Sequence, residues 1–146
     1  MYDSFLNTIT ISQAEVNQLQ LVKRFFKENG FRAQAAKSDI IYIATLEHAI
    51  VGALRLCPYD KNWLLRSMCI KEEHRHKGIG LMLLKFIRNE LQSKQCYCFP
   101  YDYLENFYHQ AGFVRIDPPQ AETNIVERYN SYISKGKKIL IMKFST

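Results

Sequence analysis

The sequence predicts a single mixed α/β domain in which helices flank one mixed sheet. The length of 146 residues suits one domain with a sizeable core. Apolar runs rich in β-branched residues alternate along the chain with segments whose apolar residues recur every three or four positions. No repeat, linker or low-complexity segment interrupts this alternation, so residues 1–146 are expected to form one domain.

The first half of the chain predicts a strand, a helix and then three further strands. The strands are expected at residues 5–11, 40–46, 49–57 and 63–70. Ser12 and Glu15 have the spacing of a capping box, which predicts a helix that begins there and ends at Gly30. The second and third strands are separated only by Glu47 and His48, so they are expected to form a hairpin.

The second half predicts three helices and three strands. The first helix is expected from Leu81, because Leu84, Ile87 and Leu91 follow at helical spacing. The other helices are expected at residues 104–111 and 122–134, and the strands at 96–99, 113–116 and 139–144. The last strand is almost entirely apolar, which predicts a central place in the sheet. An apolar strand of this kind could also extend the sheet into a second copy, as a homodimer.

The formal net charge of +6 does not come from one basic tract. The local clusters are residues 75–77 and 135–138, and the second precedes an apolar strand, as a solvated turn does. This scattered charge argues against a nucleic-acid partner. No apolar run approaches the roughly 20 residues of a membrane-spanning helix, and the first residues lack the pattern of a signal peptide. A cytoplasmic location without a membrane partner is therefore expected.

The four cysteines, Cys57, Cys69, Cys96 and Cys98, show neither C-x-x-C spacing nor the matching histidine pair of a zinc site. No metal is therefore expected. Cys96 and Cys98 are two residues apart, which places them on one face of a strand. All four are interpreted as small, buried hydrophobic residues in a reducing compartment.

The segment 75–80, Arg-His-Lys-Gly-Ile-Gly, lies between a predicted strand and a predicted helix. Backbone N–H groups without intrahelical partners point toward a ligand at such a helix N-terminus. Gly78 and Gly80 lack a Cβ, so the backbone can turn tightly and approach a phosphate closely. Arg75, His76 and Lys77 add cationic side chains at the same place. The sequence therefore predicts a binding loop for a phosphorylated ligand.

Two motifs together resemble the GNAT superfamily of N-acetyltransferases. Residues 75–80 match the acetyl-CoA pyrophosphate loop of that family, Arg/Gln-x-x-Gly-x-Gly/Ala, and residues 106–113 are similar to its Phe-Tyr-x-x-x-Gly-Phe signature. The order of the predicted elements is similar over nearly the whole chain. The resemblance implies a twisted, mostly antiparallel sheet of about seven strands that splays between its fourth and fifth strands. It also implies acetyl-CoA as cosubstrate, and an amine on a small molecule or peptide as acceptor.

The resemblance further implies which residues form the site. Those expected to bind acetyl-CoA lie at the end of the fourth strand and in the Gly-rich loop: Met68, Cys69, Ile70, Arg75, His76, Lys77, Gly78, Ile79, Gly80 and Leu81. The strand is expected to offer main-chain groups to the pantetheine arm, and a backbone N–H near Met68 to polarise the thioester carbonyl. Tyr108 is expected to face the cleft as the general acid for the CoA thiolate, while Phe107 packs into the core.

Three questions stay open at this level. Six residues near the expected site could accept the proton of the amine, and none is preferred: Glu72, Glu73, His74, His76, Asp102 and Glu105. Four tyrosines are compatible with wall packing or with an aromatic acceptor pocket: Tyr97, Tyr101, Tyr103 and Tyr108. The alternatives to direct transfer are a ping-pong route through Cys69 or Cys98, and an acetyl-CoA sensor or basic binding module without catalysis.

Overall fold

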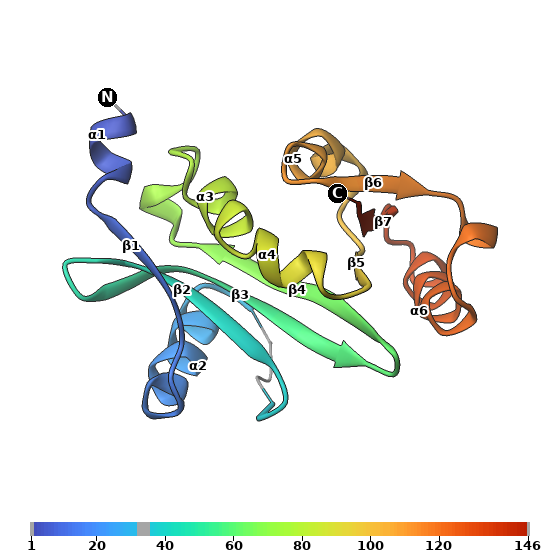
Figure 1. Cartoon of the computed structure of the whole chain (residues 1–146), viewed down its shortest axis with the longest axis horizontal. Coiled ribbons are helices and arrows are strands. Elements are labelled where there is room, and N and C mark those ends of the chain that lie inside the picture. The colour runs from blue at the N-terminus through green and yellow to red at the C-terminus, as the bar shows by residue number, and fades with distance from the viewer. Residues whose placement is uncertain (1, 32–35, 146) are drawn as a thin grey trace.

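A seven-stranded sheet in the order β1-β2-β3-β4-β5-β7-β6 forms the centre of the protein (Figure 1). The computed structural model describes residues 2–31 and 36–145. The strands are β1 Ile9–Gln13, β2 Ile40–Leu46, β3 Ala49–Tyr59, β4 Asn62–Ile70, β5 Cys96–Cys98, β6 Phe113–Ile116 and β7 Ile141–Phe144. Neighbouring strands are antiparallel except β4 and β5, which run parallel. The mixed, mostly antiparallel sheet predicted from the sequence is confirmed.

Helices cover both faces of this sheet. The helices are α1 Tyr2–Leu6, α2 Leu19–Glu28, α3 Ile79–Phe86, α4 Arg88–Gln92, α5 Glu105–Gln110 and α6 Thr123–Ser134. Helices α3, α4 and α5 lie on one face, whereas α2 and α6 lie on the other (Figure 1). Within residues 2–31 and 36–145, none of these helices has the length and apolar character that crossing a bilayer requires.

The two faces of the sheet are built by the alternation of side chains along each strand. Leu54 and Leu56 of β3, with Cys96 and Cys98 of β5, belong to the large core under α3, α4 and α5. Tyr97, between the two cysteines, faces the opposite side. Each fully buried Leu stabilises the fold by about 1.5–3 kcal/mol through the hydrophobic effect. The prediction that Cys96 and Cys98 share one face, and that all four cysteines are buried, is confirmed.

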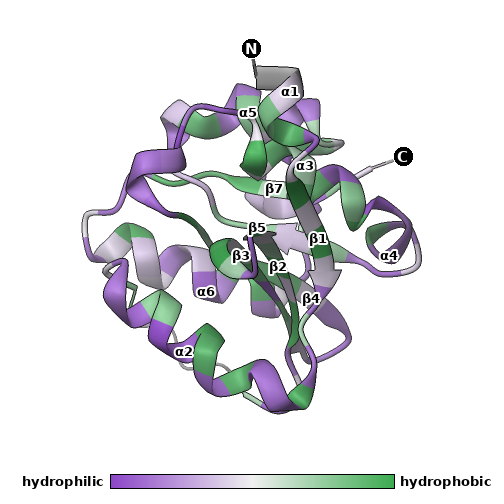
Figure 2. Ribbon diagram, turned by 90° about the vertical axis from the view of Figure 1, so that its left-hand side faces the viewer, coloured by the Kyte–Doolittle hydropathy of each residue, from purple (hydrophilic) through white to green (hydrophobic). Residues whose placement is uncertain are grey.

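The opposite face carries two separate apolar clusters. Val22, Phe25 and Phe26 of α2 pack on β2 and β3, and hydrophobic and hydrophilic residues are interspersed along this helix (Figure 2). Ile125 of α6 packs on Leu64 of β4 and on the strands beyond it. The two helices therefore dock on different halves of one face, α2 over β2 and β3 and α6 over β4, β5 and β7.

The expected strand at residues 5–11 is wrong in its position. Phe5 and Leu6 belong to α1, and β1 begins at Ile9 and continues to Gln13. Ser12 therefore lies in the strand, where it pairs with Ile43, and cannot cap a helix. The capping box forms three residues later, between Glu15 and Gln18. Pairing with β2 overrides the local signal of Ser12, since tertiary structure routinely outweighs such weak preferences.

Most of the remaining elements match their predictions. The hairpin of β2 and β3 forms, and Glu47 (φ 50°) and His48 (φ 70°) adopt the left-handed turn that usually favours Gly or Asn. The helix expected from Leu81 begins two residues earlier, at Ile79, and α3 ends at Phe86, before α4. β7 lies inside the sheet as predicted. Both of its edges are paired, so extension of the sheet across a dimer through this strand was a wrong expectation.

Gly112 and Gly136 form a matched pair for testing the packing of β7. Both have positive φ angles, +102° and +84°, but a Cβ on Gly112 would lie 2.7 Å from Cε1 of Phe144, and one on Gly136 would meet nothing within 4 Å. Gly136→Ala is expected to cost about 1–2 kcal/mol through its backbone angle. Gly112→Ala is expected to cost about 1–3 kcal/mol more, because Phe144 is buried and cannot yield easily. Urea unfolding of both variants measures the difference; equal losses would contradict the tight packing.

Candidate active site

The parallel strands β4 and β5 separate after a very short pairing. Only Trp63 with Cys96 and Leu64 with Tyr97 pair in register. Beyond Leu64, the edge of β4 that faces β5 has no strand partner within the described residues. The splay between the fourth and fifth strands, implied by the resemblance, is therefore present. A cleft of about 250 Å³ opens where the strands diverge.

The cleft is lined by both strands and by segments that converge on them. Its lining consists of Phe31, Leu65, Arg66, Ser67, Cys98, Phe99, Pro100, Tyr101, Tyr108, Tyr132, Lys137 and Ile139. Aromatic side chains and two cations dominate this set. No Asp, Glu or His occurs among these described lining residues. The six residues considered as a proton acceptor therefore lie outside the lining of the cleft.

A β-bulge in β4 lies at the floor of the cleft. In the ladder with β3, Ala53 pairs with Cys69 and Arg55 pairs with Arg66, so β4 carries one extra residue between these positions. Ser67, within the bulge, has φ +59°, an uncommon angle for a residue with a Cβ. The bulge turns main-chain groups at residues 67 and 68 out of the regular ladder.

A buried arginine holds this bulge. Arg55, 5% exposed, donates hydrogen bonds from Nε and Nη2 to Oγ of Ser67, both at 3.2 Å. Its Nη1 donates to Oδ2 of Asp39 at 3.0 Å, and that carboxylate also accepts the backbone N–H of Ala36. The ion pair therefore connects the bulge to the segment that enters β2. Hydrogen bonds to charged groups are among the strongest in proteins, so this network restrains the unusual backbone of Ser67.

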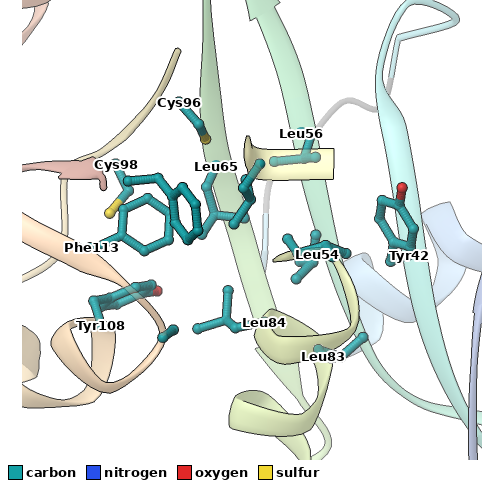
Figure 3. Close-up of a cluster of buried hydrophobic side chains, with 14 of the residues drawn as sticks. Tyr42, Leu54, Leu56, Leu65, Leu83, Leu84, Cys96, Cys98, Tyr108 and Phe113 are labelled. Atoms are coloured by element: carbon teal, nitrogen blue, oxygen red, sulfur yellow. The ribbon is translucent and has the colours of Figure 1, made fainter. Parts of the chain in front are cut away.

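Tyr108 of α5 reaches the cleft from the other side. It is 9% exposed, and its ring makes edge contacts with Phe107 and Phe113, with centroids 5.1 and 5.9 Å apart. It lies beside Phe113 and Cys98 in Figure 3. Burial, and to a lesser extent Cys98, raises the pKa of Tyr108 above its usual value, so the phenol is protonated at neutral pH. The sequence predicted that Tyr108 faces the cleft and that Phe107 packs into the core. Tyr108 does line the cleft, but it is the more buried of the two rings, and Phe107 is only half-buried.

The Gly-rich loop forms the N-terminus of α3. Gly78, with φ +97°, is the N-cap of α3. Because glycine has no side chain, no side-chain hydrogen bond caps this end of the helix. The first intrahelical hydrogen bond runs from Met82 N–H to Gly78 C=O at 3.0 Å. The N–H groups of Ile79, Gly80 and Leu81 precede it and have no partner within the helix. A Cβ on Gly80 would lie 3.1 Å from Phe107 and 4.0 Å from Sδ of Met68. The loop therefore packs closely against α5 and β4 at this glycine.

The cations of this loop are held in two ways. Arg75 donates from Nε to the carbonyl of Ile70 at 2.9 Å, which ties the loop to the end of β4. Nζ of Lys77 lies 4.9 Å from the ring centre of Phe5, and that ring stacks on His74. Helix α1 thus packs on the loop. His76, exposed and with φ +64°, occupies the turn before Lys77.

The predicted strand residues have different environments. The side chain of Cys69 is buried under α2, away from the cleft, and Met68 and Ile70 are half-buried against the larger core. Burial raises the pKa of the Cys69 thiol to about 11 and that of Cys98 well above its usual value. Neither thiol ionises appreciably at neutral pH. This argues against an acetyl-cysteine intermediate, because the thiolate is the nucleophilic form.

The four tyrosines divide between packing and the cleft. Tyr97 is buried in the cluster under α6, and Tyr103 is 77% exposed and stacks on Tyr101. Tyr101 and Tyr108 line the cleft. Tyr132, from α6, completes the aromatic wall with Phe99, with ring centres 5.7 Å apart.

The comparison with protein families identifies the fold. The Acetyltransferase (GNAT) domain family matches residues 37–115, which is more than half of the chain. This chain belongs to the GNAT acetyltransferase family. The match includes β2 to α5, and with them the bulge, the Gly-rich loop and Tyr108. No curated protein sequence matches the chain.

Solved GNAT structures share the fold at low sequence identity. N-acetylglutamate synthase from Neisseria gonorrhoeae, complexed with coenzyme A and N-acetyl-glutamate, superimposes with a TM-score of 0.67 and 13% identity over 94% of this chain. The ribosomal-protein-S18-alanine N-acetyltransferase from Escherichia coli gives 0.66 and 13%, covering 93% of this chain and 92% of that one. Arabidopsis thaliana Naa50, complexed with the bisubstrate analogue CoA-Ac-MVNAL, gives 0.65 and 14%, covering 95% and 99%. This chain spans only 35% of the synthase.

Sequence reasoning missed several residues of the GNAT cleft. Arg66, Lys137 and Phe31 line it, yet they come from segments that are distant in sequence and carry no motif. The Arg55 network was also missed. Its signal was present, because Arg55 is the only charged residue in the apolar run 49–57, and a buried arginine requires a partner.

Breaking the ion pair beneath the bulge is expected to destabilise the fold. Arg55→Leu leaves the Asp39 carboxylate buried without its cation, which costs about 3–5 kcal/mol. The double variant Arg55→Leu, Asp39→Leu removes both charges and should cost less than Arg55→Leu alone. Urea unfolding measures both, with Glu73→Ala, which breaks the exposed Lys71–Glu73 pair, as a control expected to cost about 0–1 kcal/mol. A double variant less stable than the single one would show that charge burial is not the cause.

Proposed function

We propose that this protein is an acetyl-CoA-dependent N-acetyltransferase that transfers acetyl to a primary amine by direct attack in a ternary complex. The observation that carries the proposal is the convergence on one cleft of a bulged strand edge and the buried phenol of Tyr108. The uncapped N-terminus of α3 adjoins them, because Gly80 lies against Phe107 and Met68. Acetyl-CoA supplies the activated thioester. The chain supplies binding, orientation and one proton.

The donor side of the site fits the phosphates and the arm of acetyl-CoA. The N–H groups of Ile79, Gly80 and Leu81 and the charge of Arg75 suit the pyrophosphate at the helix N-terminus. The edge of β4 along Met68, Cys69 and Ile70 has no strand partner on the side of β5 within the described residues, so its main-chain groups suit the amides of the pantetheine arm. These are the positions that the resemblance implied.

The acceptor nitrogen attacks the thioester carbon, and the C–S bond breaks as the C–N bond forms. Main-chain N–H groups released from the ladder by the bulge at residues 67 and 68 stabilise the oxyanion while its charge develops. Tyr108 donates its proton to the departing thiolate and regains one from solvent. Because no acid or histidine occurs among the described lining residues, the amine gives up its proton to water in the open cleft.

The solved relatives support this proposal through what they contain. The synthase structure holds coenzyme A with N-acetyl-glutamate, and Naa50 holds an analogue that joins CoA to a peptide. Both ligands combine a CoA donor with an acylated amine. We propose the same donor for this chain because it has its own Gly-rich loop at residues 75–80.

Gly80→Asp is expected to weaken acetyl-CoA binding by at least about tenfold. The added carboxylate would repel the pyrophosphate, and its Cβ would crowd Phe107 at 3.1 Å. Isothermal titration with acetyl-CoA measures the effect, and Gly80→Ala separates crowding from charge. Gly136→Asp, in open space, is the control for net charge. Unchanged affinity in Gly80→Asp would place the phosphates elsewhere.

Tyr108→Phe is expected to lower kcat by about 10²–10⁴-fold, the usual contribution of a general acid, with little change in acetyl-CoA affinity. The variant keeps the ring that packs on Phe113 and removes only the proton donor. Thiol release under saturating acetyl-CoA measures turnover, with the exposed Tyr103→Phe as control. Full activity would remove Tyr108 from the mechanism.

Binding of acetyl-CoA by the native chain without turnover on any amine would favour the alternative function, an acetyl-CoA sensor.

A further inference from the structure

The cleft has a positive charge that the described residues do not neutralise. Arg66 and Lys137 both line it, and no carboxylate does. Arg66 pairs in register with Arg55, whose own charge is met by Asp39. In the described part of the chain, Arg66 has no carboxylate within ion-pair distance, and Lys137 lies 5.1 Å from the ring centre of Tyr132. The four undescribed residues 32–35 include no Asp or Glu.

From this arrangement we propose that the acceptor is a small primary amine that carries an anionic group, which Arg66 and Lys137 bind. The proposal rests on the N-acetyltransferase function given above and specifies its substrate class. Carboxylate and phosphate groups share the chemistry that would satisfy these cations, and a planar guanidinium binds either with two parallel hydrogen bonds.

The positive cleft also selects against other amines. Polyamines and aminoglycosides carry several positive charges, which two uncompensated cations repel. The same field disfavours the protonated form of a single amine and thus lowers its pKa. With the anionic group paired to Arg66, the remaining charge of Lys137 still favours loss of the proton from the amine. This explains how the site can operate although no acid or histidine occurs among the described lining residues.

The size and walls of the cleft suit an occupant about as large as an amino acid. The volume of about 250 Å³ lies below the roughly 300–1,000 Å³ of pockets for drug-sized ligands. Phe31, Phe99 and Tyr132 provide flat apolar surface, and the contact between Phe99 and Tyr132 fixes part of it. An anionic amine with an apolar or aromatic body would use both the cations and these walls.

The test compares matched amines with the full chain and acetyl-CoA, by release of free thiol. L-phenylalanine and L-phenylalaninamide share the amine and the ring but differ in the carboxylate; phosphoethanolamine and ethanolamine form the corresponding phosphate pair. The anionic member of at least one pair is expected to have a kcat/KM about tenfold or more above its neutral partner, as a charge-assisted hydrogen bond would give. Which pair responds identifies the anionic group. Spermidine is expected to be the poorest acceptor.

Two variants assign the preference to the cleft. Arg66→Gln and Lys137→Gln are expected to raise KM for the anionic amine about tenfold, with acetyl-CoA affinity unchanged in isothermal titration. Lys138→Gln, next in sequence, exposed and outside the lining, is the matched control. Equal use of charged and neutral amines, or a preference for spermidine or peptide N-termini, would overturn the acceptor class and leave the acetyltransferase function standing. Acetyl-CoA binding with no amine acetylated would overturn both.

Discussion

The short parallel pairing of β4 with β5 is the constraint on which the site depends. Two residue pairs hold the strands together, and everything beyond them is opened by their divergence. The divergence exposes one edge of β4, makes room for side chains from α5 and α6, and leaves the N-terminus of α3 beside the same edge. A longer ladder would close the cleft and pair the main-chain groups that a ligand would otherwise use. The sheet is thus least regular where chemistry is proposed.

The bulge in β4 adds a second, local departure from regular structure. A positive φ at Ser67 is unfavourable by itself, so the surrounding structure must hold it. Arg55 does so from the neighbouring strand, and Asp39 neutralises the arginine from the segment leading into β2. The geometry of the main chain at the cleft is therefore connected to an ion pair beneath the sheet surface. Rigid support of this kind suits a site that acts through backbone dipoles, since dipoles fixed in advance need no reorganisation during reaction.

The fold could be predicted from sequence further than the site could. Periodicity and two motifs predicted the order of most elements and the Gly-rich loop, because each depends on residues that are close together in the chain. The motifs also carried the resemblance to the family, and that resemblance implied the splay. The first strand was displaced because pairing of Ser12 with Ile43 outweighed a capping signal. Three residues of the cleft were beyond prediction for a related reason: Phe31, Arg66 and Lys137 meet only after the whole sheet has formed. Extension of the sheet through β7 was a wrong expectation because apolar character marks an internal strand as readily as an edge strand.

The two sides of the cleft differ in how they are encoded, and this affects how the protein can evolve. The proposed donor side is one continuous stretch from β4 into α3, packed on the large core, so substitutions there are expected to affect both folding and cosubstrate binding. Phe31 and Lys137, by contrast, follow α2 and α6, and Lys137 is exposed. Phe31 also packs on the cluster under α2, with its ring centre 6.1 Å from that of Phe26, whereas substitution of the exposed Lys137 is expected to cost little stability. Under the proposed function, substitution of an exposed position such as Lys137 would change the acceptor while the use of one common acyl donor is retained.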